Sequence, residues 1–447
     1  MSQEKAHLRE SLVRRVCIWR GLRRHWPAGE ENAETRGSLK ALTVPTLGAY
    51  DLHMADINIF AATDWRNQGK RFGIRREDRR LHMYVIGRTG MGKTSLLLNM
   101  ALNDIKSGEG VCFIDPHGDA VQLLRDAVPS ARLKDTVYFS PADATKPIGL
   151  NILDDSSTTQ RHLIVSGVIS IFAHLYGHNW QHRQEHILRN ALFALLDQEA
   201  RHTLLSVYRL LIDANFRKQV TAGIKDPMVK TFWRVEYPRY LFSKSDALVT
   251  LLNKLGGFLT VPLVRNVVGK ATSDIDFRGL MDRRKILLVN LSKGRLGEDN
   301  AAFLGALVLL KLQLAAISRA NTPEHKRKDF YVYVDEAQSF VGVQGIDHLL
   351  SEARKYRLCL TMSHQYLGQL DDQMRQAIFG NVGTTVCFGV GPEDAGTLEK
   401  EFSPPFTRHD LVDQPKYHIY LRLAVNGKSS KPFSAVTLPP KFFKEKG

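Results

Sequence analysis

A glycine-rich segment that ends in a lysine and a hydroxyl residue carries the clearest chemical signal in the sequence. It reads GRTGMGKTS and matches the spacing GxxxxGK[ST], in which backbone N–H groups surround phosphate oxygens at the start of a helix. The lysine of this pattern contacts the β and γ phosphates of ATP, and the hydroxyl after it binds Mg²⁺. The predicted ATP-binding residues are Gly87, Arg88, Thr89, Gly90, Met91, Gly92, Lys93, Thr94 and Ser95.

The residues on either side of this loop support the same interpretation. A strand-like run from Met83 to Ile86 leads into the loop, and a helical segment from Ser95 to Lys106 follows it. The order strand, glycine loop, helix is the one that the phosphate site requires, which disfavours a chance glycine-rich turn. We therefore expect Lys93 to act in catalysis and Thr94 to be a Mg²⁺ ligand.

Two adjacent acids far downstream supply the second half of the predicted site. The β-branched and aromatic run from Tyr331 to Val334 ends directly in Asp335 and Glu336. We expect Asp335 to bind Mg²⁺ through its water shell and Glu336 to polarise the attacking water as the general base. The alternative, a pair of solvated loop acids, is disfavoured by the phosphate loop upstream.

Polar residues follow two further strand-like runs. In open parallel sheets, ligands bind at the carboxyl ends of strands. Gln365, which follows His364 at such an end, is therefore predicted to contact the γ phosphate or the lytic water as a sensor of hydrolysis. Asp115 has two open interpretations, a site residue or part of a structural turn. A metal-binding role for His117 is disfavoured because no Cys or His partner stands at suitable spacing.

Strands and helices must position these residues, and the apolar pattern predicts them. From residue 81 onward, short apolar runs alternate with helical segments, which is typical of an α/β domain with a largely parallel sheet flanked by helices. The predicted strands are Met83 to Ile86, Val111 to Ile114, Val137 to Phe139, Ile286 to Leu291, Tyr331 to Val334, Leu358 to Met362, Thr385 to Val390 and His418 to Leu423.

The alternation stops in the middle of the chain. Residues 155–280 show almost only helical patterns, which predicts an all-helical insertion domain. The ATPase core would then comprise a first part, residues 70–154, and a second part, residues 281–447. Residues 27–69, with their prolines, glycines and polar residues, are predicted to be a linker and amino-terminal segment.

The amino terminus, residues 1–26, is predicted to form a basic amphipathic helix. Two interpretations stay open: a helix that lies on an anionic membrane surface, and a helix that packs on its own domain with a solvated basic face. The apolar face is formed by Leu12, Val16, Trp19 and Trp26, with Arg14, Arg15, Arg20, Arg23 and Arg24 on the other faces.

Composition describes a folded protein with an excess of positive charge. The 447 residues are 43% hydrophobic and 24% charged, which excludes disordered and collagen-like chains. A net charge of +16 favours a polyanionic partner, either nucleic acid or an anionic membrane. The four cysteines lack metal-ligand spacing, which favours a reducing cytoplasm and no structural zinc.

No apolar run is long enough to be expected to span a membrane, and the richest one, Leu163 to Tyr176, is interpreted as a buried helix. The predicted location is therefore the cytoplasm, with peripheral contact at the inner face of the membrane as an option through residues 1–26.

Taken together, the motifs resemble the FtsK and HerA superfamily of DNA pumps, and most of all the type IV secretion coupling proteins of the TraG/TraD type. The resemblance covers about residues 70 to 440. The motifs that carry it are GRTGMGKT, FIDPHGD, ILLVNLSKGRLGEDNA, VYVDEAQSF, SEARKYRLCLTMSHQYLGQL and FGVGPEDAGTLEKEF.

This resemblance implies a RecA-like P-loop core and a homo-oligomeric ring, usually a hexamer, that hydrolyses ATP between neighbouring subunits and moves DNA through its channel. The context would be conjugative transfer or DNA processing, with a relaxase, a nuclease or a secretion channel as partner. Single- versus double-stranded DNA and the direction of travel stay open.

A ring of this kind requires an arginine from the next subunit to stabilise charge on the transferred phosphate. The position after the fourth predicted strand makes Arg295 the first candidate, and Arg265 is the second. Arg354 and Lys355 are a further pair, for either a subunit contact or DNA. Each arginine could instead be an ordinary surface residue.

The sequence also departs from the family pattern and admits rival functions. It shows neither the transmembrane helices of membrane-anchored coupling proteins nor, in residues 1–80, the strand pattern of the β-barrel of HerA motors. The main rival is a P-loop assembly or secretion ATPase that acts on protein substrates. A nucleotide-gated structural subunit without turnover is disfavoured because Lys93, Asp335 and Glu336 are all present.

Overall fold

The computed structural model describes residues 56–64, 66, 68–154, 160–243, 245–340 and 350–440. The chain divides into two compact units, Met1–Leu52 and His53–Gly447, and every described residue lies in the second. The predicted helix of residues 1–26 therefore lies outside the described residues, as does most of the predicted linker.

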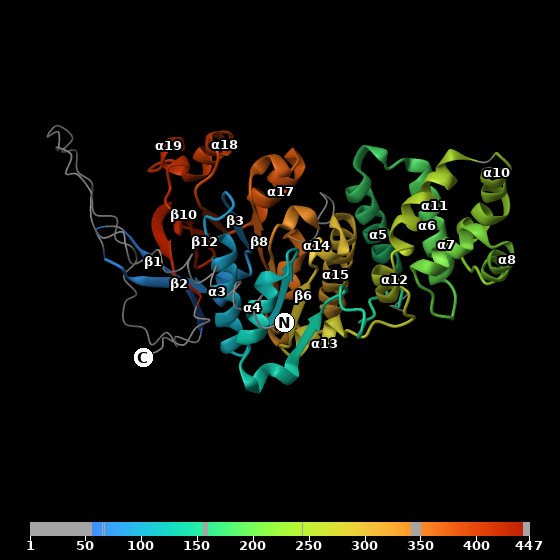
Figure 1. The fold of residues 1–447 in the computed structure, drawn as a ribbon, viewed down its shortest axis with the longest axis horizontal. Coiled ribbons are helices and arrows are strands. Elements are labelled where there is room, and N and C mark those ends of the chain that lie inside the picture. The colour runs from blue at the N-terminus through green and yellow to red at the C-terminus, as the bar shows by residue number, and fades with distance from the viewer. Residues whose placement is uncertain are drawn as a thin grey trace, which may run out of the picture. The chain divides into compact units, whose positions relative to one another are not determined.

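An eleven-stranded sheet forms the centre of the second unit (Figure 1). Its order is β2-β1-β13-β10-β9-β3-β8-β7-β4-β6-β5, and the strands from β9 to β5 are all parallel. The largely parallel sheet predicted from the sequence is thus confirmed. The parallel strands are β3 (Met83–Ile86), β4 (Gly110–Asp115), β5 (Thr136–Phe139), β6 (Ile286–Asn290), β7 (Phe330–Val334), β8 (Leu358–His364) and β9 (Thr384–Cys387).

Antiparallel strands extend one side of the sheet. They are β10 (His418–Arg422), β13 (Phe433–Thr437), β1 (Ile57–Thr63) and β2 (Arg71–Arg75), and a separate hairpin joins β11 (Ala424–Val425) to β12 (Lys428–Ser429). The sequence predicts no strand at β1, where the run INIFAAT has the strand formers Ile57, Ile59 and Phe60 but also Asn58 and two alanines, which are depleted in strands. Pairing with β13 and β2 stabilises this strand.

Both faces of the parallel strands are buried, which explains their uninterrupted apolar character. Along β3, Met83 and Val85 point into the core under α3 and α4, whereas Tyr84 and Ile86 point into the core under α15. Three cysteines in β4, β8 and β9 are buried free thiols, as expected of Cys used as a small apolar residue. These helices are α3 (Lys93–Lys106), α4 (Asp119–Ala127) and α15 (Glu298–Ser318).

Among the described residues between β5 and β6, all regular elements are helices, as predicted. The first of these helices, α5, packs against α15, so the insertion shares a continuous apolar core with one face of the sheet. The insertion contains α5 (Arg161–Tyr176), α6 (His182–Leu196), α7 (Leu204–Ile212), α8 (Ala214–Ala222), α9 (Pro227–Thr231), α10 (Tyr237–Phe242), α11 (Asp246–Leu259) and α12 (Pro262–Val268), followed by α13 (Phe277–Asp282). The remaining helices are α2 (Arg76–Arg79), α14 (Lys293–Leu296), α17 (Asp372–Asn381), α18 (Pro392–Phe402) and α19 (Arg408–Val412).

One helix among the described residues has the length and mean hydropathy of a membrane span, although Lys311 interrupts its apolar run. Residues Glu298–Asn321 meet both criteria, with a mean hydropathy of 1.9 over the best window. However, 78% of that window is buried, because the helix packs between the sheet and α5. Its uniform apolarity reflects a position in the core. The bent pair α11 and α12 passes the same test only if both helices are counted as one span.

Candidate nucleotide-binding site

The predicted phosphate loop lies between β3 and α3, in the geometry that the motif requires. Gly90 and Gly92 have φ of 82° and 120°, values that side chains rarely adopt. A Cβ on Gly92 would lie 2.7 Å from a ring carbon of Tyr417, and a Cβ on Gly87 would lie 2.5 Å from Cβ of Phe388. Glycine is therefore required at Gly92 by close packing and by backbone conformation, at Gly87 by close packing, and at Gly90 by backbone conformation.

Lys93 is buried inside the loop. Its Nζ donates to the carbonyl oxygens of Gly87 at 2.6 Å and Arg88 at 3.2 Å. Burial lowers the pKa of Lys93, while the nearby charges of Asp335 and Glu336 oppose that shift. The ammonium group is therefore held at the centre of the loop whose N–H groups would bind phosphate.

The other loop residues connect the loop to its surroundings. Arg88 donates from Nη2 to the Val412 carbonyl at 2.9 Å, and the Met91 carbonyl accepts from the Tyr417 N–H at 2.9 Å. The segment before β10 thus supports the outer side of the loop. Ser95 lies in the first turn of α3.

Thr94 and Asp335 form the predicted Mg²⁺ pair. Thr94 Oγ1 donates to Asp335 Oδ2 at 2.7 Å, across the space between the loop and the end of β7. The other carboxylate oxygen accepts from the Ser363 hydroxyl and from the Glu336 N–H at 3.1 Å. Hydroxyl and carboxylate oxygens are ligands suited to Mg²⁺, which keeps most of its waters and needs few protein ligands. This donor set fits the ion.

Ser363, which orients Asp335, was not predicted from the sequence. It lies within β8, where every residue is buried, and it is one of three polar residues of this strand, with Thr361 and His364. Its polarity was the signal available, because a buried hydroxyl requires a hydrogen-bond partner.

Glu336 has an unusual backbone and three polar partners. Its φ is 48°, a left-handed conformation that is uncommon for a non-glycine residue and concentrates at functional sites. Its Oε1 accepts from Gln365 Nε2 at 2.5 Å and lies 3.1 Å from His117 Nε2, while Oε2 lies 3.4 Å from Lys293 Nζ.

The electrostatics keep Glu336 ionised. Burial alone would raise the pKa of this carboxyl, but the hydrogen bond and charge of His117, the Lys293 ammonium and the Gln365 amide outweigh it. The pKa of Glu336 is consequently lower than usual, so the side chain is a carboxylate at neutral pH and can accept a proton.

Gln365 connects the loop to Glu336. Its Oε1 accepts from Thr89 Oγ1 at 3.0 Å while its amide nitrogen donates to Glu336. The parallel register that pairs Ile86 with His364 places these groups side by side at the carboxyl edge of the sheet. This position is consistent with the predicted contact to phosphate or water, which stays a prediction.

The side chains of Asp115 and His364 are engaged in the fold, Asp115 in a helix cap and His364 in the core. The Asp115 carboxylate accepts from the N–H groups of His117, Ala120 and Val121 at 2.8, 2.8 and 3.1 Å, so it caps the start of α4. This geometry favours the turn interpretation of Asp115. His364 is fully buried beside the Tyr84 ring, and burial lowers its pKa to about 3.

The arginine candidates differ in their surroundings. Arg295 on α14 donates to the Ala142 carbonyl at 3.0 Å, and Arg265 on α12 donates to the Leu259 carbonyl at 3.3 Å. Arg354 is exposed in the short 3₁₀ helix that precedes β8, so it lies at the amino end of that strand. Within the described part of the chain, none of these side chains forms an ion pair with Asp335 or Glu336.

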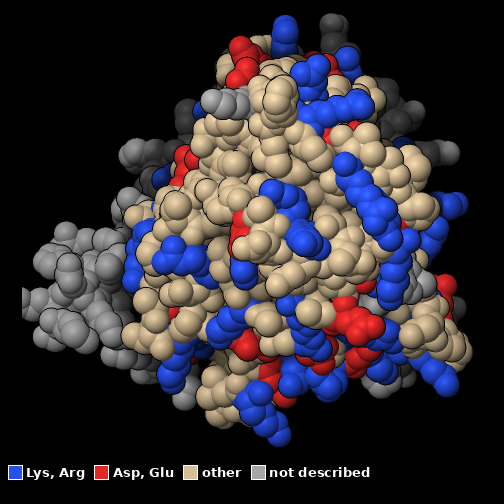
Figure 2. Space-filling view, turned by 90° about the vertical axis from the view of Figure 1, so that its right-hand side faces the viewer, with Lys and Arg blue, Asp and Glu red and all other residues tan. Residues whose placement is uncertain are grey.

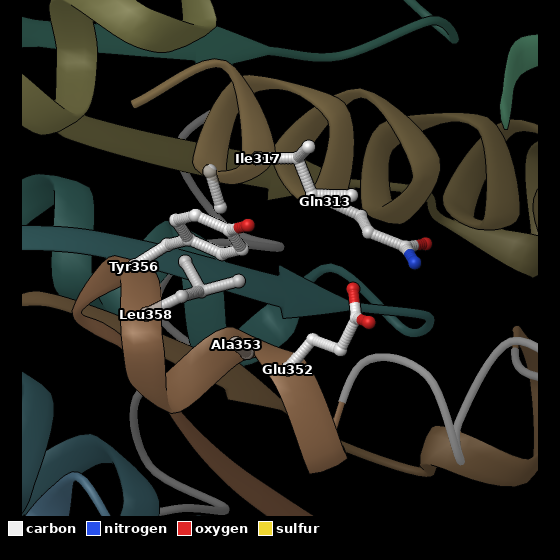
Figure 3. Close-up of a pocket in the computed structure, with 7 residues that line it drawn as sticks. Gln313, Ile317, Glu352, Ala353, Tyr356 and Leu358 are labelled. Carbon is white, nitrogen blue, oxygen red and sulfur yellow. The ribbon is translucent and has the colours of Figure 1, made fainter. Parts of the chain in front are cut away.

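A small cavity elsewhere is separate from this site (Figure 3). Gln313 and Ile317 of α15 line it on one side, and Tyr356 and Leu358 line it on the other. Leu358 begins β8, whereas Gln365 follows its end. The cavity is therefore at the opposite end of β8 from the nucleotide-binding residues.

Comparison with known proteins gives a family match over most of the chain. Residues 71–402 match the family described as the type IV secretion-system coupling protein DNA-binding domain. The type 4 coupling protein DotL of Legionella pneumophila is 22% identical over an alignment of 383 residues, and the match covers 72% of this chain and 49% of DotL. The chain spans about half the length of this curated relative.

Solved structures share the fold. The conjugative coupling protein TrwB, unbound, has 15% identity and a TM-score of 0.59, over 83% of this chain and 88% of TrwB. TrwB in complex with ADP and Mg²⁺ has 16% identity and a TM-score of 0.59, and the match covers 84% of this chain and 89% of TrwB. VirB4 of Thermoanaerobacter pseudethanolicus has 15% identity and a TM-score of 0.55, and the match covers 86% of this chain and 96% of VirB4.

Proposed function

Since the chain belongs to the type IV secretion-system coupling protein DNA-binding domain family, we propose that it is an ATP-driven motor that moves DNA. The observation that carries this proposal is the pairing of Thr94 with Asp335 at 2.7 Å, with the N–H of the next residue, Glu336, bonded to the same Asp335 carboxylate. A phosphate loop, a Mg²⁺ pair and a base at one edge of the sheet are the components of ATP hydrolysis.

Each residue has a separate role in this proposal. Lys93 and the loop N–H groups bind the phosphates of ATP, as TrwB binds ADP with Mg²⁺. Thr94 and Asp335 would hold Mg²⁺, which when bound supplies neutralisation of phosphate charge. Glu336 accepts a proton from the attacking water, and Gln365 orients that water.

We infer a ring, most simply a hexamer, in which a neighbouring subunit completes the site. Arg354 is the better supported trans-acting arginine, although the sequence ranked Arg295 first. Arg295 and Arg265 donate to carbonyls of their own chain, whereas Arg354 is exposed and has no ion pair with any carboxylate in the described ranges. Arg354 also lies at the edge of the sheet opposite its own phosphate loop, where a ring neighbour could present its nucleotide.

Mixed rings test this assignment. Inactive Lys93→Ala subunits retain Arg354, and inactive Arg354→Ala subunits retain a working phosphate loop. Mixing the two should therefore restore part of the ATPase activity. The same experiment with Arg295→Ala is the matched comparison: recovery there, with none for Arg354→Ala, would reassign the role to Arg295.

Basic surface supports a polyanionic partner. The face formed by the outer part of the helical insertion shows many Lys and Arg side chains (Figure 2). Two acids of this region, Asp213 and Asp226, are engaged as helix caps. The elements at this end contribute exposed Lys218, Lys225, Arg234 and Arg239.

Salt dependence of binding tests the DNA proposal. A protein that neutralises several DNA phosphates loses affinity steeply with added salt, with a slope of about −0.9 per phosphate contact for duplex DNA. We expect such a slope for this protein. Weak binding without a salt slope would favour the rival ATPase that acts on protein substrates. A relaxase, nuclease or secretion-channel partner and membrane contact through residues 1–26 are further proposals, the last on residues outside the described ranges.

A further inference from the structure

The carboxylate of Glu336 is held by side chains from neighbouring strand ends. Glu336 follows β7, and Gln365 reaches it from the end of β8. His117 approaches from the segment after β4, and Lys293 from the segment after β6, on the side of β7 away from β8. Neither His117 nor Lys293 has a role in the function proposed above.

The segment after β4 is built to fix the position of His117. The Asp115 carboxylate accepts from three backbone N–H groups of this turn, including that of His117. Gly118 has a φ of 94°, and a Cβ there would lie 2.5 Å from Asn290 Oδ1 and 2.6 Å from Ser292 Oγ. The turn therefore depends on Asp115 and Gly118, and it uses the backbone of His117 but not its imidazole.

The segment after β6 is bonded to the same turn. The Leu291 N–H donates to the Asp115 carbonyl at 3.0 Å, and the Lys293 N–H donates to the Pro116 carbonyl at 2.8 Å. Between them, Ser292 has a left-handed φ of 32°. These backbone hydrogen bonds hold the two segments together. From this unit the side chains of His117 and Lys293 both contact the Glu336 carboxylate.

We propose that His117 and Lys293 are positioning residues that hold the Glu336 carboxylate in its productive orientation. His117 contacts Oε1 through Nε2, and Lys293 contacts Oε2 through its ammonium group. A glutamate on a flexible side chain would otherwise rotate between conformers, and misplacement of a catalytic group by about 1 Å can cost roughly 100-fold in rate. This inference rests on the proposed function, in which Glu336 is the general base.

Substitutions at His117 separate this role from a role in the turn. Because the contact is made through Nε2, His117→Gln can place its own Nε2 at a similar reach, whereas the amide of His117→Asn is shorter. We expect single-turnover hydrolysis to fall about 10- to 100-fold in His117→Ala and His117→Asn, and to be largely retained in His117→Gln. ATP affinity should stay within about 2-fold, because Lys93 and Thr94 are untouched.

Lys293 and a neighbouring surface residue complete the set of variants. Lys293→Met removes the charge but keeps much of the length, and it should also lower the hydrolysis rate without changing ATP affinity. Gln122→Ala, on the exposed side of α4, is the matched control and should hydrolyse ATP at the normal rate. Equal rates in all His117 variants, or a loss of ATP affinity that accounts for the lower rate, would overturn the proposal.

A double-mutant cycle with Glu336→Gln shows whether His117 acts through Glu336. If it does, adding His117→Ala to Glu336→Gln should cause no further loss of the residual hydrolysis. A further 10-fold loss in the double variant would contradict the proposed pathway. The two hypotheses fail differently: near-normal turnover in Glu336→Gln alone would refute the base, whereas an inactive Glu336→Gln with a normal His117→Ala would refute only the positioning role.

Discussion

Binding and hydrolysis of ATP should be separable by two substitutions in the same site. Lys93→Ala removes the buried ammonium group that lies within the loop, 2.6 Å from the Gly87 carbonyl. A hydrogen bond to a charged group contributes about 1.5–3 kcal/mol, so ATP should bind roughly 10- to 150-fold more weakly. Hydrolysis would then fall mainly because the site is empty.

Glu336→Gln should have the opposite profile. The amide has the shape of the carboxylate, whose side chain is only 13% exposed, but it cannot accept a proton. General base catalysis contributes about 10²- to 10⁴-fold, so hydrolysis should fall by that factor while ATP affinity stays near normal.

The assay combines two measurements on each variant. Titration with a fluorescent ATP analogue gives the dissociation constant, and phosphate release in a single turnover gives the rate of hydrolysis. Thermal unfolding of each variant is the control for folding. Near-normal turnover of Glu336→Gln, or unchanged ATP affinity of Lys93→Ala, would show that these roles are wrongly assigned.

Three further changes test the loop packing, helix α18 and the amino terminus. Gly92→Ala should lower the free energy of unfolding by about 1–3 kcal/mol in urea titrations, because φ is 120° and its Cβ would meet Tyr417. Gly396→Ala, in open space on α18, should instead raise the free energy of unfolding by about 0.4–1 kcal/mol. A lower free energy of unfolding in this variant would contradict the helical position of Gly396. Deletion of residues 1–26 should reduce co-sedimentation with anionic vesicles and leave ATPase activity unchanged; equal sedimentation would reject the membrane contact.

The residues of the phosphate loop could be predicted because their signal is local. The spacing of the GxxxxGK[ST] motif is enough to identify the backbone N–H groups, the Lys93 ammonium group and the Thr94 hydroxyl that lie together after the end of β3. The apolar run before Asp335 likewise indicates a buried strand that ends in two acids. These predictions required no knowledge of which strands are neighbours.

The partners of Glu336 could not be predicted in the same way. The contacts of His117 and Lys293 depend on β4 and β6 lying beside β7, an order that follows from crossovers through α15 and the long insertion. Apolar periodicity identifies strands but not their neighbours. Arg354 illustrates the same limit, since its position at the amino edge of β8 is a property of the assembled sheet.

The most direct test of the proposed function is the ATPase rate of the purified protein without DNA, with single-stranded DNA and with duplex DNA. We predict a higher turnover with at least one DNA form, a stimulation that weakens with added salt and disappears in Glu336→Gln. An active enzyme whose rate is the same under all three conditions would contradict a DNA-moving motor.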